Sequence, residues 1–498
     1  MPEASCPKLY EINTRVWLRE IGSALGRPAT LDDISDAELD HLASQGFGWI
    51  WLLGVWQTGE TGRIVSATYA GWRNSFAEAL HDLKDEDICG SCFAITGYAV
   101  HRTLGGDAAL IRLRERMHRR GLRLMLDFVS NHTAIDHPWV SQRPELYVQG
   151  TAGDLTRAPE DFVRVLTERG PLILAHGRDP GFPVWPDVAQ LNYGEPATGL
   201  AMTDVLLAIA KLCDGVRCDM AMLVLPDIFR ASWGIATGPF WSKAIRRVRA
   251  SYPDFLFLAE VYWQLERELL REGFDYVYDK GLYDRLRSQT ARPVREHLRA
   301  ASVDQRRLVR FLENHDEKRA AEAFPWDVHQ AAAVLCYLAP GLRLFHQGQF
   351  EGRRKQLPVH LSRADAEPVN AAVSAFYDQL MSLLRKPVFQ DGDWQCLDPD
   401  EAWPGNGSWN GFIGFQWTGR CGTVWIVAVN YQPCQGQCYL RCPGMACGPV
   451  ILTDQMGAAS YEREGGDLAS RGLFLDMPGW SYHVFELTQR LSEPVGAG

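Results

Sequence analysis

Short apolar runs of strand length alternate with amphipathic, helix-like stretches from the N-terminus to about residue 350. In one such unit, Leu110, Leu113 and Met117 recur at the spacing of a single helix face. Asp107 precedes them and suits the N-cap of this helix, and the apolar run Leu122–Phe128 follows as a buried strand. This alternation predicts βα units arranged around a parallel sheet.

Eight strands are predicted in this part of the chain. Their ranges are Leu9–Val16, Trp49–Leu53, Arg123–Phe128, Gly215–Cys218, Phe255–Ala259, Tyr276–Tyr278, Leu308–Leu312 and Leu342–Phe345. Eight βα units in succession indicate an α/β fold of the (β/α)8 TIM-barrel type. A doubly wound parallel sheet is the alternative.

Two segments break the alternation. Residues 134–190, after the third strand, are rich in Pro, Gly and Asp and too long for one helix, so we expect a small inserted domain there. Beyond residue 388, strands such as Val424–Asn430 and Leu473–Pro478 follow one another without helices, which is typical of an antiparallel β-sandwich. The predicted domains are a barrel over 1–133 and 191–387, the inserted domain over 134–190 and a C-terminal β-domain over 388–498.

The charge of the chain argues against nucleic acid and membranes as partners. The 498 residues carry a formal net charge of −10 and the pI is near 5.8, whereas nucleic acid requires a basic surface. We see no Lys- or Arg-rich run for an anionic membrane surface, no signal peptide and no membrane-spanning apolar stretch. The 17 Trp are either large core side chains or flat faces for sugar rings.

The cysteines favour a reduced, cytoplasmic protein. Several of the twelve lie inside apolar runs, where a thiol behaves as a small hydrophobic group. Cys89 and Cys92 form a C-x-x-C pair without a second pair at zinc-site spacing, so no metal site is predicted there. The spacing of four cysteines near the C-terminus leaves a disulfide open: Cys434, Cys438, Cys442 and Cys447.

Several predicted strands end in charged side chains. Asp127 ends one strand, Arg217 and Asp219 share one side of another, and Glu260 directly follows a third. A fourth strand runs on to the pair His315–Asp316. In a (β/α)8 barrel the carboxyl ends of the strands converge on one face, where active sites lie. The sequence therefore predicts three carboxylates and an arginine in one pocket.

Each of these residues also has a plainer interpretation. An Asp after a strand is often a helix N-cap or a turn residue, and Arg217 with Asp219 can be a simple local ion pair. Four strand ends of this kind together favour a functional site. In such a site Arg217 would keep Asp219 ionised, as a nucleophile requires.

Four short motifs follow one another along the predicted barrel: Asp127–His132, Gly215–Asp219, Ala259–Val261 and Glu313–Asp316. In their order and intervals they resemble the signature regions of the α-amylase superfamily, glycoside hydrolase family 13. Gln190–Asn192 lies where that family carries a further short motif. The C-terminal strands resemble its β-domain more loosely, so the resemblance spans nearly the whole chain.

The resemblance implies a retaining glycosidase. By it, Asp219 is the nucleophile, Glu260 is the general acid/base, and Asp316 is the third carboxylate, which binds and distorts the sugar. Retaining glycosidases use two carboxyl groups about 5–5.5 Å apart. Nearby negative charge stabilises their oxocarbenium-like transition state.

The resemblance also implies the contacts to the sugar in subsite −1, where the bond is cleaved. Arg217, His132 and His315 would contact the ring, and Asp127 would hold together the network at the end of the barrel. Phe93 aligns with an aromatic residue that stacks on this sugar. A position in the core is the alternative for Phe93.

Three positions depart from the family pattern. Many exo-acting members carry an Asp where this chain has Gly90, which argues against an oligo-1,6-glucosidase-like assignment. Typical α-amylases have a Lys-His pair for the acceptor sugar where this chain has Met222 and Leu223. Tyr262 and Trp263 could form an aromatic acceptor platform instead, with core packing of Trp263 as the alternative.

No cofactor and no metal ligand are predicted. Asn131 matches a calcium ligand of the family, and loop hydrogen bonding is its alternative role. The acidic ligands of the inserted domain are not clearly placed, since Gln190 stands near one such position. A structural calcium ion therefore stays open.

The predicted function is hydrolysis of α-glucosidic bonds in maltooligosaccharides or related α-glucosides. The first alternative is a transferase or isomerase with the same machinery, such as a glucanotransferase or a sucrose- or trehalose-active enzyme. The second is a non-catalytic binding or transport-accessory relative, against which the three intact carboxylates argue. The sequence predicts no linkage preference, chain-length preference or oligomeric state.

Overall fold

A closed barrel of eight parallel strands forms the centre of the protein. The computed structural model describes residues 6–168, 170–300, 303–445 and 447–489. The barrel strands follow one another around the ring as β1 (Lys8–Asn13), β14 (Leu342–His346), β13 (Leu308–Arg310), β12 (Tyr276–Tyr278), β11 (Leu256–Ala259), β10 (Gly215–Asp219), β5 (Arg123–Val129) and β2 (Trp49–Leu53). All eight predicted strands belong to it, so the (β/α)8 prediction is confirmed.

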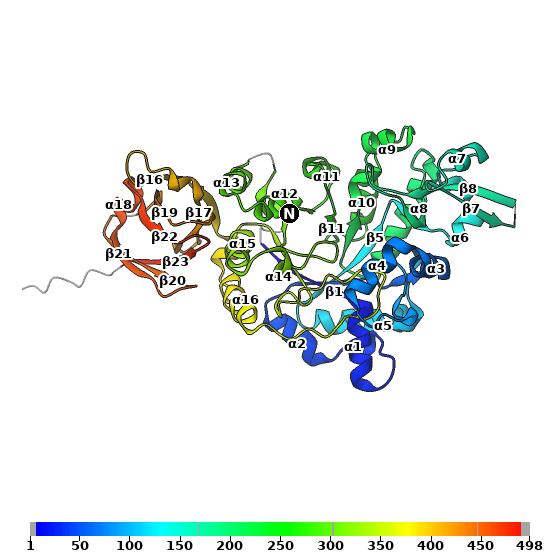
Figure 1. The fold of residues 1–498 in the computed structure, drawn as a ribbon, viewed down its shortest axis with the longest axis horizontal. Helices are drawn as coiled ribbons and strands as arrows, with labels where there is room; N and C mark the ends of the chain where they lie inside the picture. Colours follow the sequence, from blue (N-terminus) through cyan, green and yellow to red (C-terminus); the bar gives the residue numbers. More distant parts are fainter. Residues whose placement is uncertain (1–5, 169, 301–302, 446, 490–498) are drawn as a thin grey trace, which may run out of the picture.

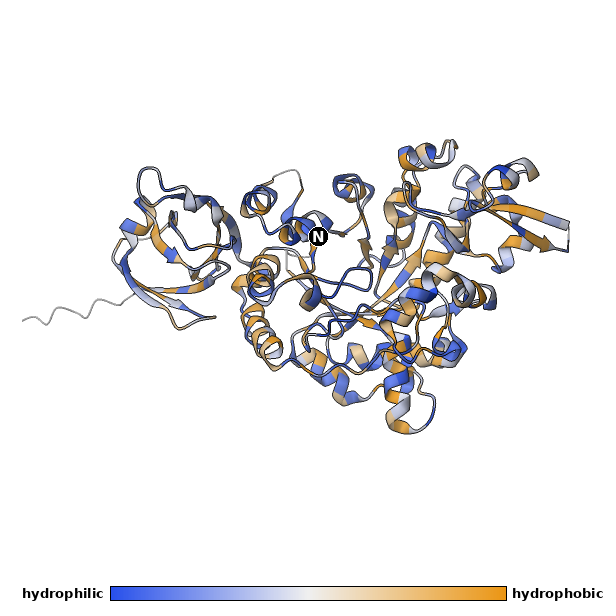
Figure 2. Ribbon diagram, in the orientation of Figure 1, coloured by the Kyte–Doolittle hydropathy of each residue, from blue (hydrophilic) through white to orange (hydrophobic). Residues whose placement is uncertain are grey.

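Helices cover the outside of the barrel, which explains why its strands read as continuous apolar runs. Every residue of β2, β10 and β14 is buried. Figure 2 shows the hydrophobic residues concentrated along the barrel strands. The main covering helices are α1 (Thr14–Leu25), α2 (Asp36–Ser44), α5 (Gly106–His118), α8 (Pro196–Ile209), α10 (Trp241–Arg249), α11 (Glu266–Glu272), α12 (Lys280–Arg287), α13 (Ala291–Arg299), α15 (Trp326–Leu338) and α16 (Ala371–Leu384).

At two helix starts the predicted boundary is wrong because another residue caps the helix. The first strand ends at Asn13, because the Asn13 side chain accepts a hydrogen bond from the Val16 amide and caps α1, so that Val16 is helical. Asp107 does not cap its helix. It lies inside the first turn, and its carboxylate accepts from the Val100 amide at 2.7 Å. Gly105, in the left-handed conformation with φ 100°, takes the N-cap position.

An antiparallel sheet is inserted after β5. Its strands follow the order β6 (His132–Ala134), β9 (Trp185–Gln190), β8 (Gly170–Gly177) and β7 (Phe162–Thr167). Short helices α6 (Pro138–Gln142) and α7 (Ala152–Arg157) accompany them. In Figure 1 this region lies at one end of the molecule, beside α8 and α9 (Pro226–Trp233). Because β6 begins three residues after β5 ends, the insertion starts at the carboxyl end of the barrel.

The C-terminal region is made of two antiparallel sheets that enclose a core of their own. It lies at the other end of the molecule in Figure 1. One sheet has the order β15 (Asp393–Leu397), β17 (Phe412–Thr418), β18 (Val424–Asn430), β23 (Tyr482–Gln489), β20 (Pro449–Asp454) and β21 (Ser460–Glu464). The other consists of β16 (Pro399–Glu401), β19 (Gly436–Leu440) and β22 (Leu473–Met477).

Buried hydrogen bonds fasten this region to the barrel helices. The Trp417 indole donates to the Leu338 carbonyl at 2.7 Å, and the Tyr431 hydroxyl donates to the Leu286 carbonyl at 2.7 Å. All twelve cysteines are free thiols, including the four near the C-terminus. Among the described residues, no helix is long and apolar enough to cross a membrane.

Candidate active site

The register between β10 and β11 brings two carboxylates together. Cys218 of β10 pairs with Ala259 of β11, so the next residues, Asp219 and Glu260, leave the barrel at the same level. The Arg217 side chain lies between them and is fully buried. Its Nη1 is 2.6 Å from Asp219 Oδ1, and its Nη2 is 2.7 Å from Glu260 Oε2. One guanidinium therefore bridges both carboxylates.

Glu260 is the more enclosed of the two acids. The backbone amide of Met220 donates to its Oε2 at 2.6 Å, and the Tyr262 hydroxyl donates to its Oε1 at 2.8 Å. Met220 adopts a left-handed conformation with φ 43°, directly after Asp219. Burial raises the pKa of Glu260 to about 7, with Arg217 opposing this shift and the Asp219 charge adding to it. Glu260 thus changes protonation state near neutral pH.

Aromatic rings surround the Arg217 guanidinium. Its central carbon lies 5.3 Å from the ring centroid of Trp51, 5.4 Å from that of Phe93 and 5.9 Å from that of Tyr278. Such contacts favour a buried cation. They also fix the guanidinium in the plane from which it reaches both carboxylates.

Asp316 reaches the same pocket from the loop after β13, beside His315. The His315 Nε2 lies 3.0 Å from Asp316 Oδ2, and its Nδ1 lies 2.5 Å from Glu11 Oε1. Burial opposes the charging of His315, but these two carboxylates outweigh it and hold the pKa of His315 well above its ordinary value. Desolvation raises and His315 lowers the pKa of Asp316, and the net result is a lowered pKa. The Asp316 side chain is 45% exposed, so it faces the open part of the pocket.

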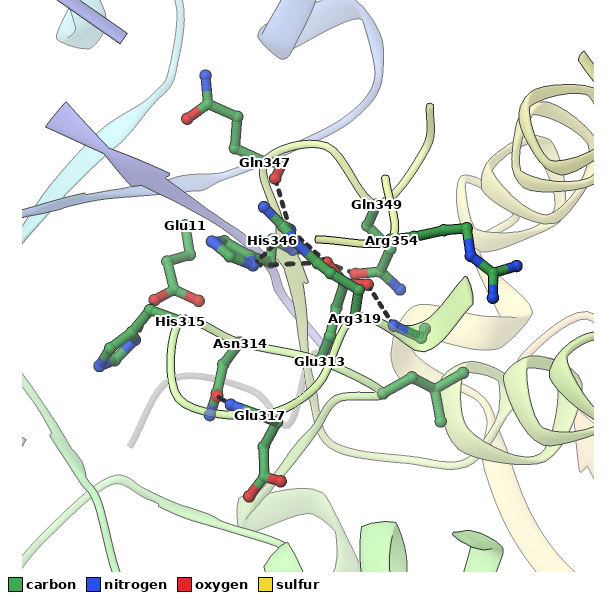
Figure 3. A network of polar contacts seen from close by, with 12 residues as sticks. Glu11, Glu313, Asn314, His315, Glu317, Arg319, His346, Gln347, Gln349 and Arg354 are labelled. Carbon is green, nitrogen blue, oxygen red and sulfur yellow. Dashed lines mark hydrogen bonds and ion pairs between the residues drawn. The ribbon is translucent and has the colours of Figure 1, made fainter. Parts of the chain in front are cut away.

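A buried polar network fixes the loop that carries Asp316 (Figure 3). Glu313 accepts hydrogen bonds from Arg319 Nη1 at 2.6 Å and from the Ala320 amide at 2.7 Å. Arg319 Nη1 also donates to the Gln347 carbonyl at 2.8 Å, in the segment after β14. The Asn314 side chain accepts from the backbone amide of Asp316 at 2.9 Å. The loop is therefore held at both ends and in the middle.

His132 and Phe93 lie around the same pocket. Burial lowers the pKa of His132 to about 4, so its ring is neutral and can exchange hydrogen bonds with a hydroxyl. The His132 ring packs beside Trp185 of the inserted sheet, at 5.1 Å between centroids. The Phe93 ring lies 5.5 Å from that of His315 and is only partly buried. Phe93 thus packs against the edge of the core and lies beside His315 and Arg217.

Asp127 is turned toward the neighbouring strand. Its Oδ1 accepts from the Trp51 indole at 3.0 Å, and its Oδ2 accepts from the Gly54 amide at 2.9 Å. Burial raises the pKa of Asp127 to about 6, against the effect of Arg217. Both oxygens are therefore used within the protein, and Asp127 ties β5 to β2 at the carboxyl end of the barrel.

The residues after Asp219 and Glu260 differ in exposure. Met222 and Leu223 are 0% and 4% exposed in a 3-10 turn and pack in the core, so they offer no surface to a ligand. Trp263 is 42% exposed, and both Trp263 and Gln264 have left-handed backbones with φ 60° and 63°. The strained turn, three residues after Glu260, leaves the Trp263 side chain exposed instead of packed in the core.

Asn131 and Gln190 form a reciprocal pair of side-chain amides. Asn131 Nδ2 donates to Gln190 Oε1 at 3.1 Å, and Gln190 Nε2 donates to Asn131 Oδ1 at 2.9 Å. Both side chains are buried, and although calcium takes amide carbonyl oxygens as ligands, each of these oxygens already accepts a hydrogen bond from the other amide. In the described part of the chain, a group of three possible metal ligands occurs at His81, Asp82 and Asp365, outside this site. The side-chain oxygens of Asn131 and Gln190 are thus both used within the protein.

Three groups that contact the predicted site residues were not predicted from the sequence. Glu11 is a buried acid in β1 that contacts His315, 304 positions away along the chain. The Met220 amide acts through its backbone, which no side-chain pattern reveals. Arg319 holds the loop that carries Asp316 through its bond to Glu313. The only sign of this in the sequence was that Arg319 lies three residues after Asp316.

Comparison with known proteins finds similarity to alpha-amylases and to a maltosyltransferase. The family model described as alpha amylase, catalytic domain, matches residues 38–150. Alpha-amylase MalA of Haloarcula japonica is 24% identical over 354 residues, which cover 70% of this chain and 44% of that protein. An alpha-1,4-glucan:maltose-1-phosphate maltosyltransferase of Cereibacter sphaeroides is 27% identical over 266 residues, 51% of this chain and 32% of that protein. The chain thus spans less than half the length of these curated relatives.

Solved structures share the fold along the whole chain. An alpha-amylase from Lactobacillus plantarum superposes with a TM-score of 0.69 at 20% identity, covering 97% of this chain and 99% of that one. The alpha-amylase from Geobacillus thermoleovorans, complexed with acarbose, gives 0.67 at 17% identity, with 99% and 100% coverage. At this level of identity the likeness shows the fold.

Proposed function

The chain belongs to the α-amylase superfamily, glycoside hydrolase family 13, and from this premise we propose that it hydrolyses α-glucosidic bonds with retention of configuration. Its substrates are maltooligosaccharides or related α-glucosides. Asp219 is the nucleophile, Glu260 is the general acid/base, and Asp316 is the third carboxylate of the reaction.

The bridge that Arg217 forms between Asp219 and Glu260 carries this proposal. A single guanidinium contacts both carboxylates at 2.6 and 2.7 Å, which requires the two acids to be close neighbours. Retaining glycosidases place them about 5–5.5 Å apart, whereas inverting enzymes need roughly 6.5–9.5 Å to admit a water molecule. The observed bridge supports a nucleophile and an acid on opposite sides of one glycosidic bond.

The proposed reaction proceeds in two steps. Asp219 attacks the anomeric carbon while Glu260 protonates the departing oxygen, which gives a covalent glycosyl-enzyme. Glu260, now ionised, then deprotonates a water molecule that attacks the same carbon from the side that the leaving group has left. Each step inverts the configuration once, so the product retains that of the substrate.

Charge around the sugar stabilises the transition state of both steps. Asp316 keeps its negative charge through contact with His315 and faces the open pocket, where the ring becomes positive. We assign ring contacts to Arg217, His132 and His315, a stacking surface to Phe93 and a supporting role to Asp127. Trp263 would meet the sugar on the leaving-group side.

The stereochemistry of the first product tests this function. Hydrolysis of a maltooligosaccharide should release the α-anomer before mutarotation, because two successive inversions at one carbon cancel. Proton NMR spectra of early time points separate the two anomeric signals. A β-anomer as the first product would rule out the retaining mechanism.

The activity should depend on the protonation of Glu260. Its pKa is raised from the ordinary value to about 7, so the acid form is present below that pH and is lost above it. We expect kcat/KM for maltooligosaccharides to fall as the pH rises through about 7. A stopped assay over a pH series measures this alkaline fall in kcat/KM. A profile that stays flat far into the alkaline range would assign the acid to another group.

We further propose that the enzyme needs no calcium ion, since the reciprocal amide pair of Asn131 and Gln190 satisfies itself. Treatment with EDTA should leave both the activity and the melting temperature nearly unchanged. Differential scanning fluorimetry with and without EDTA provides the measurement. A large fall in melting temperature, restored by calcium, would contradict the proposal.

Transfer to a sugar acceptor is the second candidate function. The exposed side chain of Trp263, three residues after Glu260, favours it, because a sugar stacked on it could replace water as the attacking group. A maltosyltransferase also stands among the relatives. Chromatographic product identification on maltotriose, sucrose and trehalose separates hydrolysis from transfer and isomerisation.

A cytoplasmic location is proposed with this function, since thiols such as Cys421 and Cys434 are free and exposed.

A further inference from the structure

The order of the strands places the loops after β1, β14 and β2 across the barrel from Glu260. In the closed ring, β1 lies opposite β11, four strands away in either direction, and β14 and β2 flank β1. Glu260 protonates the leaving oxygen in the proposed reaction, so the leaving group lies on the β11 side, beside the exposed Trp263. The non-reducing end of the bound sugar must therefore point toward the loops after β1, β14 and β2.

Two of these loops are joined to each other, and we call the joined segments 81–92 and 353–367 the clasp. The first segment lies between β2 and α5, and the second lies between β14 and α16. Ile88 and Leu361 form an antiparallel bridge. The Cys89 amide donates to the His360 carbonyl at 2.8 Å, and the Ser362 amide donates to the Asp87 carbonyl at 2.9 Å.

The buried side chain of Asp87 holds the two segments of the clasp together. Its side chain is fully buried and accepts two hydrogen bonds from Arg363, Nε to Oδ1 at 2.9 Å and Nη2 to Oδ2 at 2.7 Å. Arg19 of α1 donates to the same Oδ1 at 3.1 Å. Paired bonds of this kind fix orientation as well as distance. A small apolar core lies under the clasp, made of Phe76, Ala79, Leu80, Ile88 and Leu361.

The clasp reaches the catalytic loop and leaves little room beside it. Gln356 Nε2 donates to the backbone carbonyl of Asp316 at 2.5 Å. The cavity between His315 and the clasp has a volume of about 20 Å³, lined by Asn13, Ala79, Leu357, Ala364 and Glu367 among others. A cavity of this size holds about one water molecule. This enclosed space, which Arg319, His346 and Gln347 also line, is too small for a sugar ring, so a second ring would have to displace part of the clasp.

We propose that the active site is a pocket closed behind subsite −1, so that the enzyme accepts a single terminal α-glucosyl residue. The inference rests on the proposed function, since Glu260 must be the acid for the loops opposite to face the non-reducing end. The substrate class is then α-glucosyl groups with a free non-reducing end, including disaccharides and chain ends, and the clasp closes the pocket although Gly90 stands where many exo-acting members carry an Asp. Glucose units inside a chain are excluded by the clasp.

Two fluorides with the same leaving group test the pocket. We expect the wild-type enzyme to release fluoride from α-glucosyl fluoride at least about 100-fold faster than from α-maltosyl fluoride, whose second ring must lie beyond subsite −1. Equal or faster release from α-maltosyl fluoride would overturn the pocket while leaving the proposed function intact. Failure with both fluorides would refute the proposed function, and the pocket with it.

Opening the clasp should relax this selectivity. Arg363→Ala removes the two hydrogen bonds that Arg363 donates to Asp87. Gln356→Ala removes the bond between the clasp and the Asp316 carbonyl and leaves every buried charge in place. Each should raise the rate on α-maltosyl fluoride relative to α-glucosyl fluoride by about tenfold or more. The control is Arg112→Ala, which loses a similar paired contact with Asp32 on the helix side of the barrel. An unchanged ratio in both clasp variants would show that the clasp does not close the pocket.

Discussion

Glu260→Gln should lose nearly all cleavage of maltooligosaccharides, by roughly 10³-fold in kcat, because a poor leaving group must be protonated as the bond breaks. The loss should be much smaller for the first step on α-glucosyl fluoride, whose leaving group needs little help. The substitution should preserve the fold. The glutamine carbonyl can accept from the Met220 amide, as Glu260 Oε2 does now, and can lie beside Arg217. Steady-state assays on both substrates measure the difference.

Azide then distinguishes Glu260 from Asp219. In Glu260→Gln the glycosyl-enzyme should accumulate, because nothing deprotonates the incoming water. Azide needs no deprotonation and should restore turnover, giving an α-glucosyl azide. Asp219→Ala lacks the nucleophile and should form neither the intermediate nor that azide. The same response to azide in both variants, with the same product anomer, would show that the two roles are wrongly assigned.

Asp316→Asn should lower kcat/KM by about 10³-fold, or ~4 kcal/mol of transition-state stabilisation, while keeping the fold. The substitution removes negative charge from the open pocket where the sugar ring becomes positive. Circular dichroism checks the fold, and kcat/KM on a maltooligosaccharide gives the effect. The matched control is Glu317→Gln, which removes the same charge one residue away, where the side chain contacts Lys280 at 3.2 Å. If Asp316→Asn keeps more than about a tenth of the wild-type kcat/KM, a loss under ~1.4 kcal/mol, Asp316 is a structural residue.

The barrel was predictable because strands that are buried on both faces appear in the sequence as continuous apolar runs. Trp49–Leu53 and Tyr276–Tyr278 are strands with the same bounds that their apolar runs predicted. Boundaries that depend on side-chain hydrogen bonds were harder to place. Asn13 caps α1 and cuts the first strand short, and Asp107 bonds back to Val100 rather than to its own helix. For Asn13 and for Asp107, the sequence alone did not show which backbone amide the side chain would bind.

The two central carboxylates were predictable because consecutive strands of a barrel bring their ends together. To predict that Asp219 and Glu260 lie close together, it was enough to assign their strands and to know that strand ends converge in a barrel. Glu11 was not predictable in this way. It lies in a strand that is buried except at its last residue, and its role depends on His315, which lies 304 positions further along the chain. Met222 and Leu223 look like a changed acceptor surface in the sequence, but the turn after Asp219 buries both.

The assignment of Asp219 as nucleophile is tested most directly by identifying the residue that carries the sugar. A 5-fluoroglycosyl fluoride of the α-gluco series slows the second step and should trap the glycosyl-enzyme, whose peptic peptides are then sequenced by mass spectrometry. We expect the added mass of one fluorosugar on Asp219, and no label on Glu260 or Asp316. A label on either of those two carboxylates, or an enzyme that turns over the reagent without ever carrying the sugar, would contradict the mechanism.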